Sequence, residues 1–226
     1  MNEKVILALD FSEKSEVIST IKNFKGKIKW VKVGMELYYS EGPEIIHYLK
    51  DQDLSIFLDL KLHDIPNTVS QSLKNLCKLP IDMINVHALG GGVMLSEASK
   101  VVKDSLYSPY LIAVTQLTST DELTFKELGF KTSLVDNVAT LSQLAHQSHL
   151  DGVVSSAHEV PIIKNLCGPD FLCVTPGIRF SDSSNNDQKR VMTPENAIKL
   201  GSDFLVMGRS LINNPNLLDL IPGENV

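Results

Sequence analysis

Charged residues stand close together at positions where a core β-strand should be apolar. Asp59 and Lys61 alternate with leucines in the run FLDLKLHDIPN (57–67), Asp64 follows at once, and Lys32 interrupts the run WVKVG (30–34). An array of alternating charges that stays ionised inside a cavity is suited to electrostatic or acid–base chemistry. The alternative is a structural ion-pair network, which is the more usual explanation of an isolated Asp–Lys pair.

The cost of burying ions favours the functional interpretation. Two unit charges about 4 Å apart interact by roughly 4 kcal/mol at an effective dielectric near 20, so mutual pairing can offset much of the desolvation. Leucines at the same positions would be at least as stable, so stability alone does not explain the charges. We interpret the cluster as a site.

The elements that must position this cluster are short β-branched runs, each followed by an amphipathic helical pattern. The runs cover residues 5–10, 30–34, 55–61, 83–88, 110–117, 152–156, 171–177 and 204–208. Without a composition break or linker, this alternation predicts one α/β domain over residues 1–226, and the strand count fits a closed (β/α)8 TIM barrel. A doubly wound open sheet uses the same alternation, so periodicity leaves the closure open.

Barrel geometry predicts where the side chains point, because successive strand residues face opposite sides of a sheet. The apolar set should face the helices: Val5, Leu7, Leu9, Val31, Val33, Leu58, Leu60 and Leu62. The polar set should face the barrel axis: Asp10, Lys32, Asp59 and Lys61. These polar residues lie near the C-terminal ends of their strands, the end at which barrel active sites are built.

Composition limits the classes of partner. The 226 residues are 43% hydrophobic and 21% charged with a net charge of −6, and no Lys/Arg stripe is present, so we expect no nucleic-acid partner. The N-terminus shows no signal-peptide pattern and no apolar run approaches about 18 residues, so we expect a soluble, cytoplasmic protein with no membrane partner. Cys77, Cys167 and Cys173 fit no disulfide framework and are expected to be buried thiols.

The segment DLKLHDIPNT (59–68) closely resembles the signature of the orotidine 5'-phosphate decarboxylase family, in its bacterial branch. Further segments in the family's order are ALDF (8–11), VKVGMELYY (31–39), NVHALGG (85–91), AVTQLTS (113–119), VTPGIR (174–179), DQKRVMTP (187–194) and VMGRS (206–210). One departure is Leu89, where the family pattern has a smaller residue before the glycines.

The resemblance implies a (β/α)8 homodimer that converts orotidine 5'-monophosphate to UMP and CO2, the last step of de novo UMP synthesis, without metal or organic cofactor. Lys32, Asp59, Lys61 and Asp64 then form the catalytic array. Lys61 would stabilise the carbanion at C6 of the pyrimidine and protonate it. Asp64, with Ile65 and Thr68, would reach into the partner subunit's site.

The resemblance also implies how the nucleotide is held. Asp10 and Lys32 would contact the ribose hydroxyls, and Thr118 the pyrimidine edge. The phosphate would bind Arg179, Gln188, Gly208 and Arg209, because loops after strands 7 and 8 commonly bind phosphate in barrels. The polar loop between Ile178 and Met192 is expected to close over it.

Alternatives from two other classes remain. A related sugar-phosphate barrel, such as a keto-gulonate phosphate decarboxylase or hexulose phosphate synthase, shares Asp-x-Lys-x-x-Asp but uses a magnesium ion and an enediolate. A degenerate barrel could bind a nucleotide as a sensor. His63 is expected to point outward, and His87 has no companion ligand at metal-binding spacing, so the sequence predicts no metal site.

Overall fold

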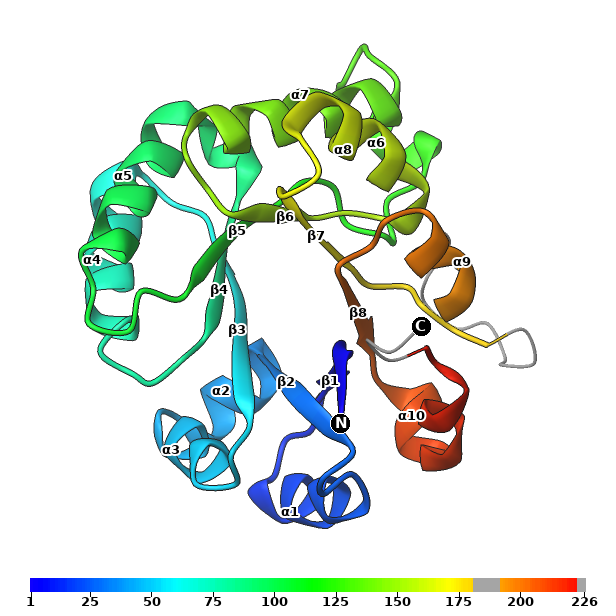
Figure 1. Cartoon of the computed structure of the whole chain (residues 1–226). Coiled ribbons are helices and arrows are strands. Elements are labelled where there is room, and N and C mark those ends of the chain that lie inside the picture. The colour runs from blue at the N-terminus through cyan, green and yellow to red at the C-terminus, as the bar shows by residue number, and fades with distance from the viewer. Residues whose placement is uncertain (181–191, 223–226) are drawn as a thin grey trace.

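Parallel β-strands close into a barrel in a computed structural model of the chain, which describes residues 1–180 and 192–222 (Figure 1). Strand β8 pairs with β1 through Val5 and Leu205, so the sheet has no free edge. The predicted closed barrel is confirmed, and the open doubly wound sheet is excluded. The strands are β1 (Asn2–Ala8), β2 (Ile28–Gly34), β3 (Ser55–Leu62), β4 (Met83–His87), β5 (Tyr110–Val114), β6 (Gly152–Val154), β7 (Leu172–Thr175) and β8 (Phe204–Met207).

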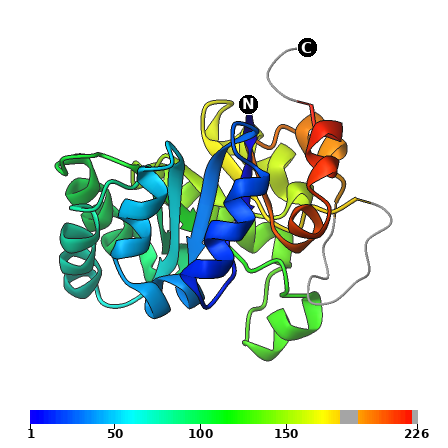
Figure 2. The same ribbon diagram turned by 90° about the horizontal axis from the view of Figure 1, so that it is seen from below.

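Helices surround the barrel as an outer ring (Figure 1). They are α1 (Lys14–Asn23), α2 (Met35–Glu41), α3 (Glu44–Lys50), α4 (Pro66–Leu76), α5 (Gly91–Lys103), α6 (Glu122–Glu127), α7 (Leu134–Gln147), α8 (Val160–Cys167), α9 (Pro194–Lys199) and α10 (Arg209–Asn213). Short 3-10 turns are η1 (Ala88–Gly90), η2 (Ala157–Glu159) and η3 (Pro215–Leu220). The segment that carries α6 extends beyond the barrel at the end opposite the N-terminus (Figure 2).

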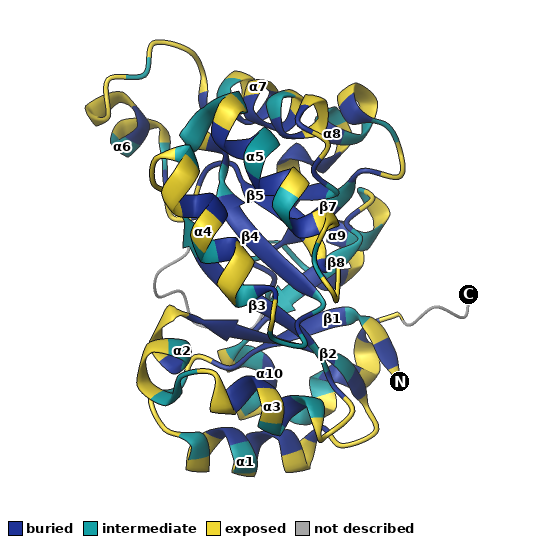
Figure 3. Cartoon of the chain, turned by 90° about the vertical axis from the view of Figure 1, so that its left-hand side faces the viewer, coloured by how far each residue is buried: buried dark blue, intermediate teal, exposed yellow. Residues whose placement is uncertain are grey.

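Apolar side chains form two separate cores, as the alternation predicts. The larger core lies between the strands and the helices and contains the outward-facing set, including Val5, Leu7, Val31 and Leu58, while Leu62 packs against it partly buried. The smaller core fills the barrel and consists of Ile6, Trp30, Phe57, Met83, Ile112 and Val174. In Figure 3 the strands are accordingly buried, whereas the helices are exposed on their outer faces.

Most strands end earlier than the predicted runs, and the difference matters at two of them. Strand β1 stops at Ala8 and β5 at Val114, so Asp10 and the residues from Gln116 onward lie on loops above the barrel. Leu9, Thr115 and Gln116 remain buried beyond the last ladder pair. The pattern of buried residues therefore continues past the strand, and burial by itself does not distinguish a strand from the loop that follows it.

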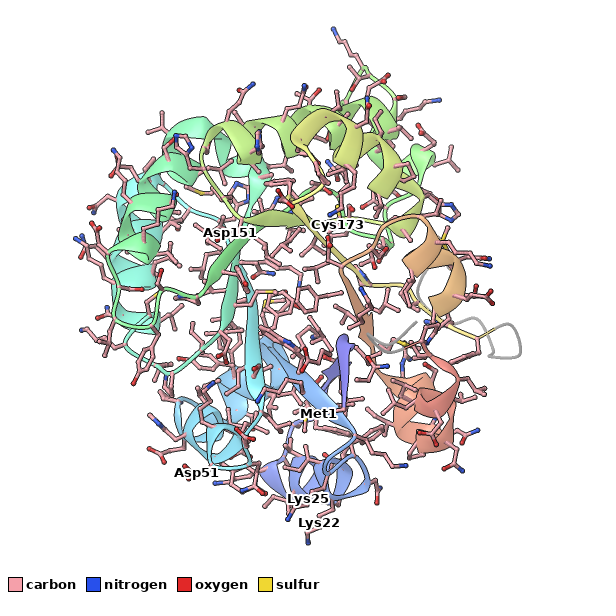
Figure 4. All side chains as sticks on the ribbon, in the orientation of Figure 1. Met1, Lys22, Lys25, Asp51, Asp151 and Cys173 are labelled. Atoms are coloured by element: carbon pink, nitrogen blue, oxygen red, sulfur yellow. The ribbon has the colours of Figure 1, made fainter. Side chains whose placement is uncertain are left out.

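Cys77, Cys167 and Cys173 are free and buried, as predicted, and Cys173 lies on β7 inside the ring of helices (Figure 4). Within the described ranges, no helix combines the length and apolar character needed to cross a membrane.

The inner core should contribute strongly to stability. Met83 has no exposed surface and sits at the centre of the barrel, so Met83→Ala should lower the free energy of unfolding by about 2–5 kcal/mol. Leu123→Ala, on α6 where the side chain is 73% exposed, is the matched control and should change it by less than about 0.5 kcal/mol. Urea titration at fixed protein concentration measures both, and equal effects of the two substitutions would contradict the assignment.

Candidate active site

A cavity of about 580 Å³ opens at the C-terminal ends of the barrel strands. Its volume lies within the range of small-molecule sites. Phe57, Val154 and Val206 from the inner barrel form part of its lining. The predicted site residues that line it are Asp10, Lys32, Asp59, Lys61, Thr118, Arg179, Gly208 and Arg209.

Asp10 on the loop after β1, Lys32 on β2, and Asp59 and Lys61 on β3 form an unbroken series of ion pairs, called here the charged chain. Asp10 Oδ1 lies 2.9 Å from Lys32 Nζ, which lies 3.4 Å from Asp59 Oδ2. Lys61 Nζ donates to the other oxygen of Asp59, Oδ1, at 2.7 Å. Charges therefore alternate along the chain, and both oxygens of the Asp59 carboxylate face an ammonium group.

Ion pairing determines whether the two buried groups, Asp59 and Lys32, are charged. Burial by itself would raise the pKa of Asp59, but Lys32 and Lys61, with hydrogen bonds from Lys61 and Asn85, hold that pKa below its ordinary value. Burial would likewise lower the pKa of Lys32, yet the carboxylates of Asp59 and Asp10 raise it above its ordinary value. Both groups thus stay charged at neutral pH inside the protein.

Asn85 on β4 is part of this arrangement and was missed by the sequence reasoning. Its Nδ2 donates to Asp59 Oδ1 at 2.7 Å, and its Oδ1 accepts the backbone N–H of Lys61 at 2.7 Å. Lys61 has a φ of 51°, in the left-handed region, which costs a non-glycine residue roughly 1–2 kcal/mol. The alternation applied to Met83 on the same strand would have placed Asn85 inside the barrel.

Gly34, the last residue of β2, is a second residue that the sequence reasoning missed. A Cβ built on it would lie 3.0 Å from Lys32 Nζ and 3.5 Å from Asp10 Oδ1. Any side chain there would crowd the Lys32–Asp10 pair. The signal was present in WVKVG, where Trp30, Lys32 and Gly34 share the inward face.

The opposite wall of the cavity comes from the loops after β5, β7 and β8. Thr118 is 8% exposed there, and Arg179 and Arg209 contribute from the segments after β7 and β8. Arg179 is fixed through its backbone, whose N–H donates to Met192 O at 2.9 Å. A Cβ at Gly208 would meet Ala8 only at an ordinary 3.4 Å, so packing within the chain does not by itself require glycine there.

Comparison with known proteins assigns the sequence to one family. The sequence fits the model of the Orotidine 5'-phosphate decarboxylase / HUMPS family over residues 3–219. The chain belongs to this family. Proteins named orotidine 5'-phosphate decarboxylase from Carboxydothermus hydrogenoformans and Geobacillus kaustophilus are 48% and 52% identical to it, over 220 and 216 residues. These matches cover 96% and 93% of this chain and 92% and 88% of those proteins.

A solved structure gives the same result for the fold. The crystal structure of orotidine 5'-phosphate decarboxylase from Lactobacillus acidophilus superposes with a TM-score of 0.82 at 35% identity, covering 96% of each chain. Membership of the orotidine 5'-phosphate decarboxylase / HUMPS family, predicted from the motifs, is confirmed.

Residues that the family resemblance assigns to a partner's site lie on the surface of the single chain. Asp64, Ile65 and Thr68 are exposed where β3 passes into α4, and Ile65 is 67% exposed. Asp64 Oδ1 accepts the Ile65 N–H at 2.7 Å, while Lys61 pairs with Asp59. Gln188 and the expected lid over residues 181–191 lie outside the described residues and stay predictions.

Two of the histidines, His63 and His87, lie next to each other and are not part of the charged chain. His63 is exposed, and its ring stacks on His87 with centroids 5.3 Å apart. Burial, with smaller contributions from His63 and Lys61, lowers the pKa of His87 to about 4, so His87 is neutral at physiological pH. Among the described residues, no three His, Cys, Asp or Glu side chains are grouped to hold a metal ion.

The charge pairing predicts a pKa change. In Lys32→Met, burial acts on Asp59 with one ammonium fewer to oppose it, so the pKa of Asp59 should rise relative to the wild type. The carboxyl group would then take up its proton at a higher pH, which 13C NMR of labelled aspartate, assigned with Asp59→Asn, can follow. Lys50→Met, which removes the separate Lys50–Asp82 pair, should leave this titration unchanged. An unaltered Asp59 titration in Lys32→Met would refute the coupling.

Proposed function

We propose that the chain decarboxylates orotidine 5'-monophosphate to UMP and CO2, the last step of de novo UMP synthesis. The observation that carries the proposal is the continuous chain from Asp10 through Lys32 and Asp59 to Lys61 along one wall of a nucleotide-sized cavity. Relatives matching over nearly the whole length carry the name of this activity. The proposal takes residues 1–226 as one catalytic domain that uses no cofactor.

The chemistry requires electrostatic stabilisation. Loss of CO2 from C6 leaves a carbanion in the ring plane, with no adjacent carbonyl positioned to delocalise it. A cation fixed beside C6 before the reaction lowers the barrier, because it needs no reorganisation as the charge develops. Lys61 is suited to this role: its side chain is 28% exposed toward the cavity and its ammonium is held by Asp59 at 2.7 Å. The same ammonium then donates the proton to C6.

The remaining contacts orient the nucleotide. Asp10 and Lys32 lie beside each other where the ribose hydroxyls would bind, and Thr118, which lines the cavity, would contact the pyrimidine edge. Arg179, Gly208 and Arg209, with Gln188, would bind the phosphate, since an arginine fork matches phosphate geometry. Binding energy from the remote phosphate could then be used at C6.

A homodimer would complete the site. Asp64, Ile65 and Thr68 are exposed at the rim of the barrel, where a second subunit can be contacted. In the proposed symmetric dimer, Asp64 of one subunit would approach Lys61 of the other as a second carboxylate. The symmetry makes the exchange reciprocal, so each dimer has two shared sites.

The sugar-phosphate alternative needs a carboxylate that is available to magnesium. In this structure Asp59 Oδ1 accepts from Lys61 and Asn85, and Asp59 Oδ2 faces Lys32. That arrangement favours ammonium chemistry over metal chemistry at this carboxylate. The intact charged chain likewise favours catalysis over a sensor that only binds a nucleotide.

The wild-type protein should consume orotidine 5'-monophosphate, followed by loss of pyrimidine absorbance, and should do so in excess EDTA. Lys61→Ala should lower kcat by at least about 10³-fold, because both charge stabilisation and proton donation are lost. It should still bind UMP in a calorimetric titration.

Lys103→Ala is the control for Lys61→Ala, because Lys103 is exposed in the last turn of α5. It should keep wild-type kcat. Near-normal turnover by Lys61→Ala would rule Lys61 out as the acid. Activity that EDTA abolishes and Mg²⁺ restores would point to the sugar-phosphate chemistry.

The shared site predicts complementation between inactive variants. Co-expressed Lys61→Ala and Asp64→Ala subunits should recover about a quarter of wild-type activity, since half of the random dimers carry one intact site of two. Lys61→Ala with Asp59→Ala is the matched control and should recover nothing, because both residues belong to the same subunit's wall. Absence of recovery in the first pair would exclude a site shared through Asp64.

A further inference from the structure

We propose that Asn85 is a positioning residue that sets the catalytic geometry of Lys61 from behind the cavity wall. The inference rests on the proposed function and adds to it a residue that does not line the cavity. Asn85 has no exposed surface, and neither of its polar atoms is directed to the substrate side. Both atoms form hydrogen bonds within the protein: Nδ2 donates to Asp59, and Oδ1 accepts from the backbone N–H of Lys61.

The hydrogen-bond ladder between β3 and β4 is interrupted around Lys61. Leu58 pairs with Ile84, but the next pair is Leu62 with Val86, so the register shifts between them. Lys61 lies within this irregular stretch, in the left-handed region at φ 51°. A buried backbone N–H without a ladder partner is costly, and the Asn85 side-chain carbonyl accepts it at 2.7 Å. Asn85 thus replaces the missing strand pairing.

Asn85 also orients the Asp59 carboxylate, which in turn holds the Lys61 ammonium. Asp59 Oδ1 accepts from Lys61 Nζ and Asn85 Nδ2, each at 2.7 Å, which leaves Oδ2 toward Lys32. One amide therefore fixes the backbone of Lys61 and the rotamer of the group holding its ammonium. A small displacement of a catalytic group can cost on the order of 10²-fold in rate.

The groups around position 85 determine how a titratable substitute would behave. Asp59 and Lys61 face it from β3, with Lys32 on β2 beyond Asp59, and the β5 residue in register, Ile112, is apolar. His87, two residues along β4, has its pKa lowered to about 4 by burial together with His63 and Lys61, so it is neutral above pH 5. A carboxyl group placed at 85 would meet the negative charge of Asp59 most closely.

Asn85→Ala tests the role directly. It should lower kcat for orotidine 5'-monophosphate on the order of 10²-fold with KM changed less than about 3-fold, because the amide acts on Lys61 and not on the nucleotide. Thr115→Val is the matched control: Thr115 is fully buried after β5 and does not line the cavity, and its Oγ1 donates to Val154 O at 2.9 Å. It should lower the Tm while keeping kcat.

Asn85→Asp gives a signature that a general loss of stability would not. The neutral carboxyl group can donate to Asp59 and accept from Lys61, as the amide does, but the ionised form loses the donor and repels Asp59. The ratio of variant to wild-type kcat should therefore fall as the pH rises from 5 to 9. A flat ratio, or a variant as impaired as Asn85→Ala at every pH, would overturn the proposal.

Two further outcomes separate this inference from the proposed function. Wild-type protein that leaves orotidine 5'-monophosphate unchanged would refute the proposed function. Wild-type kcat in Asn85→Ala, or equal kcat losses in Asn85→Ala and Thr115→Val, would refute the role of Asn85 alone. Independently of any activity, a crystal structure of Asn85→Ala should show Lys61 displaced, and an unmoved Lys61 φ and Lys61–Asp59 pair would overturn the inference.

Discussion

The Asp59 carboxylate, held between two ammonium groups inside the barrel, is the constraint on which the site depends. Burial by itself would raise the pKa of this acid, and Lys32 and Lys61, with the Asn85 amide, hold it below its ordinary value. The dependence is mutual, since Asp59 and Asp10 keep Lys32 charged against the same burial. Removing one partner of a buried pair typically costs about 3–5 kcal/mol because it leaves an uncompensated charge. The cluster therefore behaves as a unit.

The closed barrel makes this arrangement possible by stacking two layers on its axis. Trp30, Phe57 and Met83 belong to the apolar layer. The next inward positions along the same strands carry the polar residues Lys32, Asp59 and Asn85. Register brings the strands together at this level, since Ala8 pairs with Lys32 and Gly34 with Asp59. A dry floor beneath the charges lowers the local dielectric and strengthens each interaction above it. The inner core thus supports both the stability of the barrel and the electrostatics of the site.

Much of this could be read from the sequence because a strand has a period of two. That rule placed Asp10, Lys32, Asp59 and Lys61 on one face, and the structure brings them together. The same period-two rule also places Asn85 and Gly34 on the inward face. They were missed because the search considered only charged residues. The left-handed backbone of Lys61 could not be predicted, because it depends on a hydrogen bond to another strand. The roles of Asp64 and Gln188 stay predictions, since the first concerns a second subunit and the second lies outside the described residues.

Solvent exposure differs between the centre and the ends of the charged chain. The difference distinguishes the residues that keep their neighbours charged from those proposed to contact the substrate. At the centre, the side chains of Lys32 and Asp59 are 11% and 10% exposed, whereas Asp10 and Lys61 at the ends are 59% and 28% exposed. Lys32 and Asp59 also line the cavity, but they have little contact with solvent and fix the charge and direction of their neighbours. The ends face the cavity, one beside the place proposed for the ribose and the other beside the place proposed for C6. Because the ends share the central pair, a substrate that contacts Asp10 would also act on the electrostatic environment of Lys61. Binding at the position proposed for the sugar would then be coupled to the reacting carbon without any movement of the backbone.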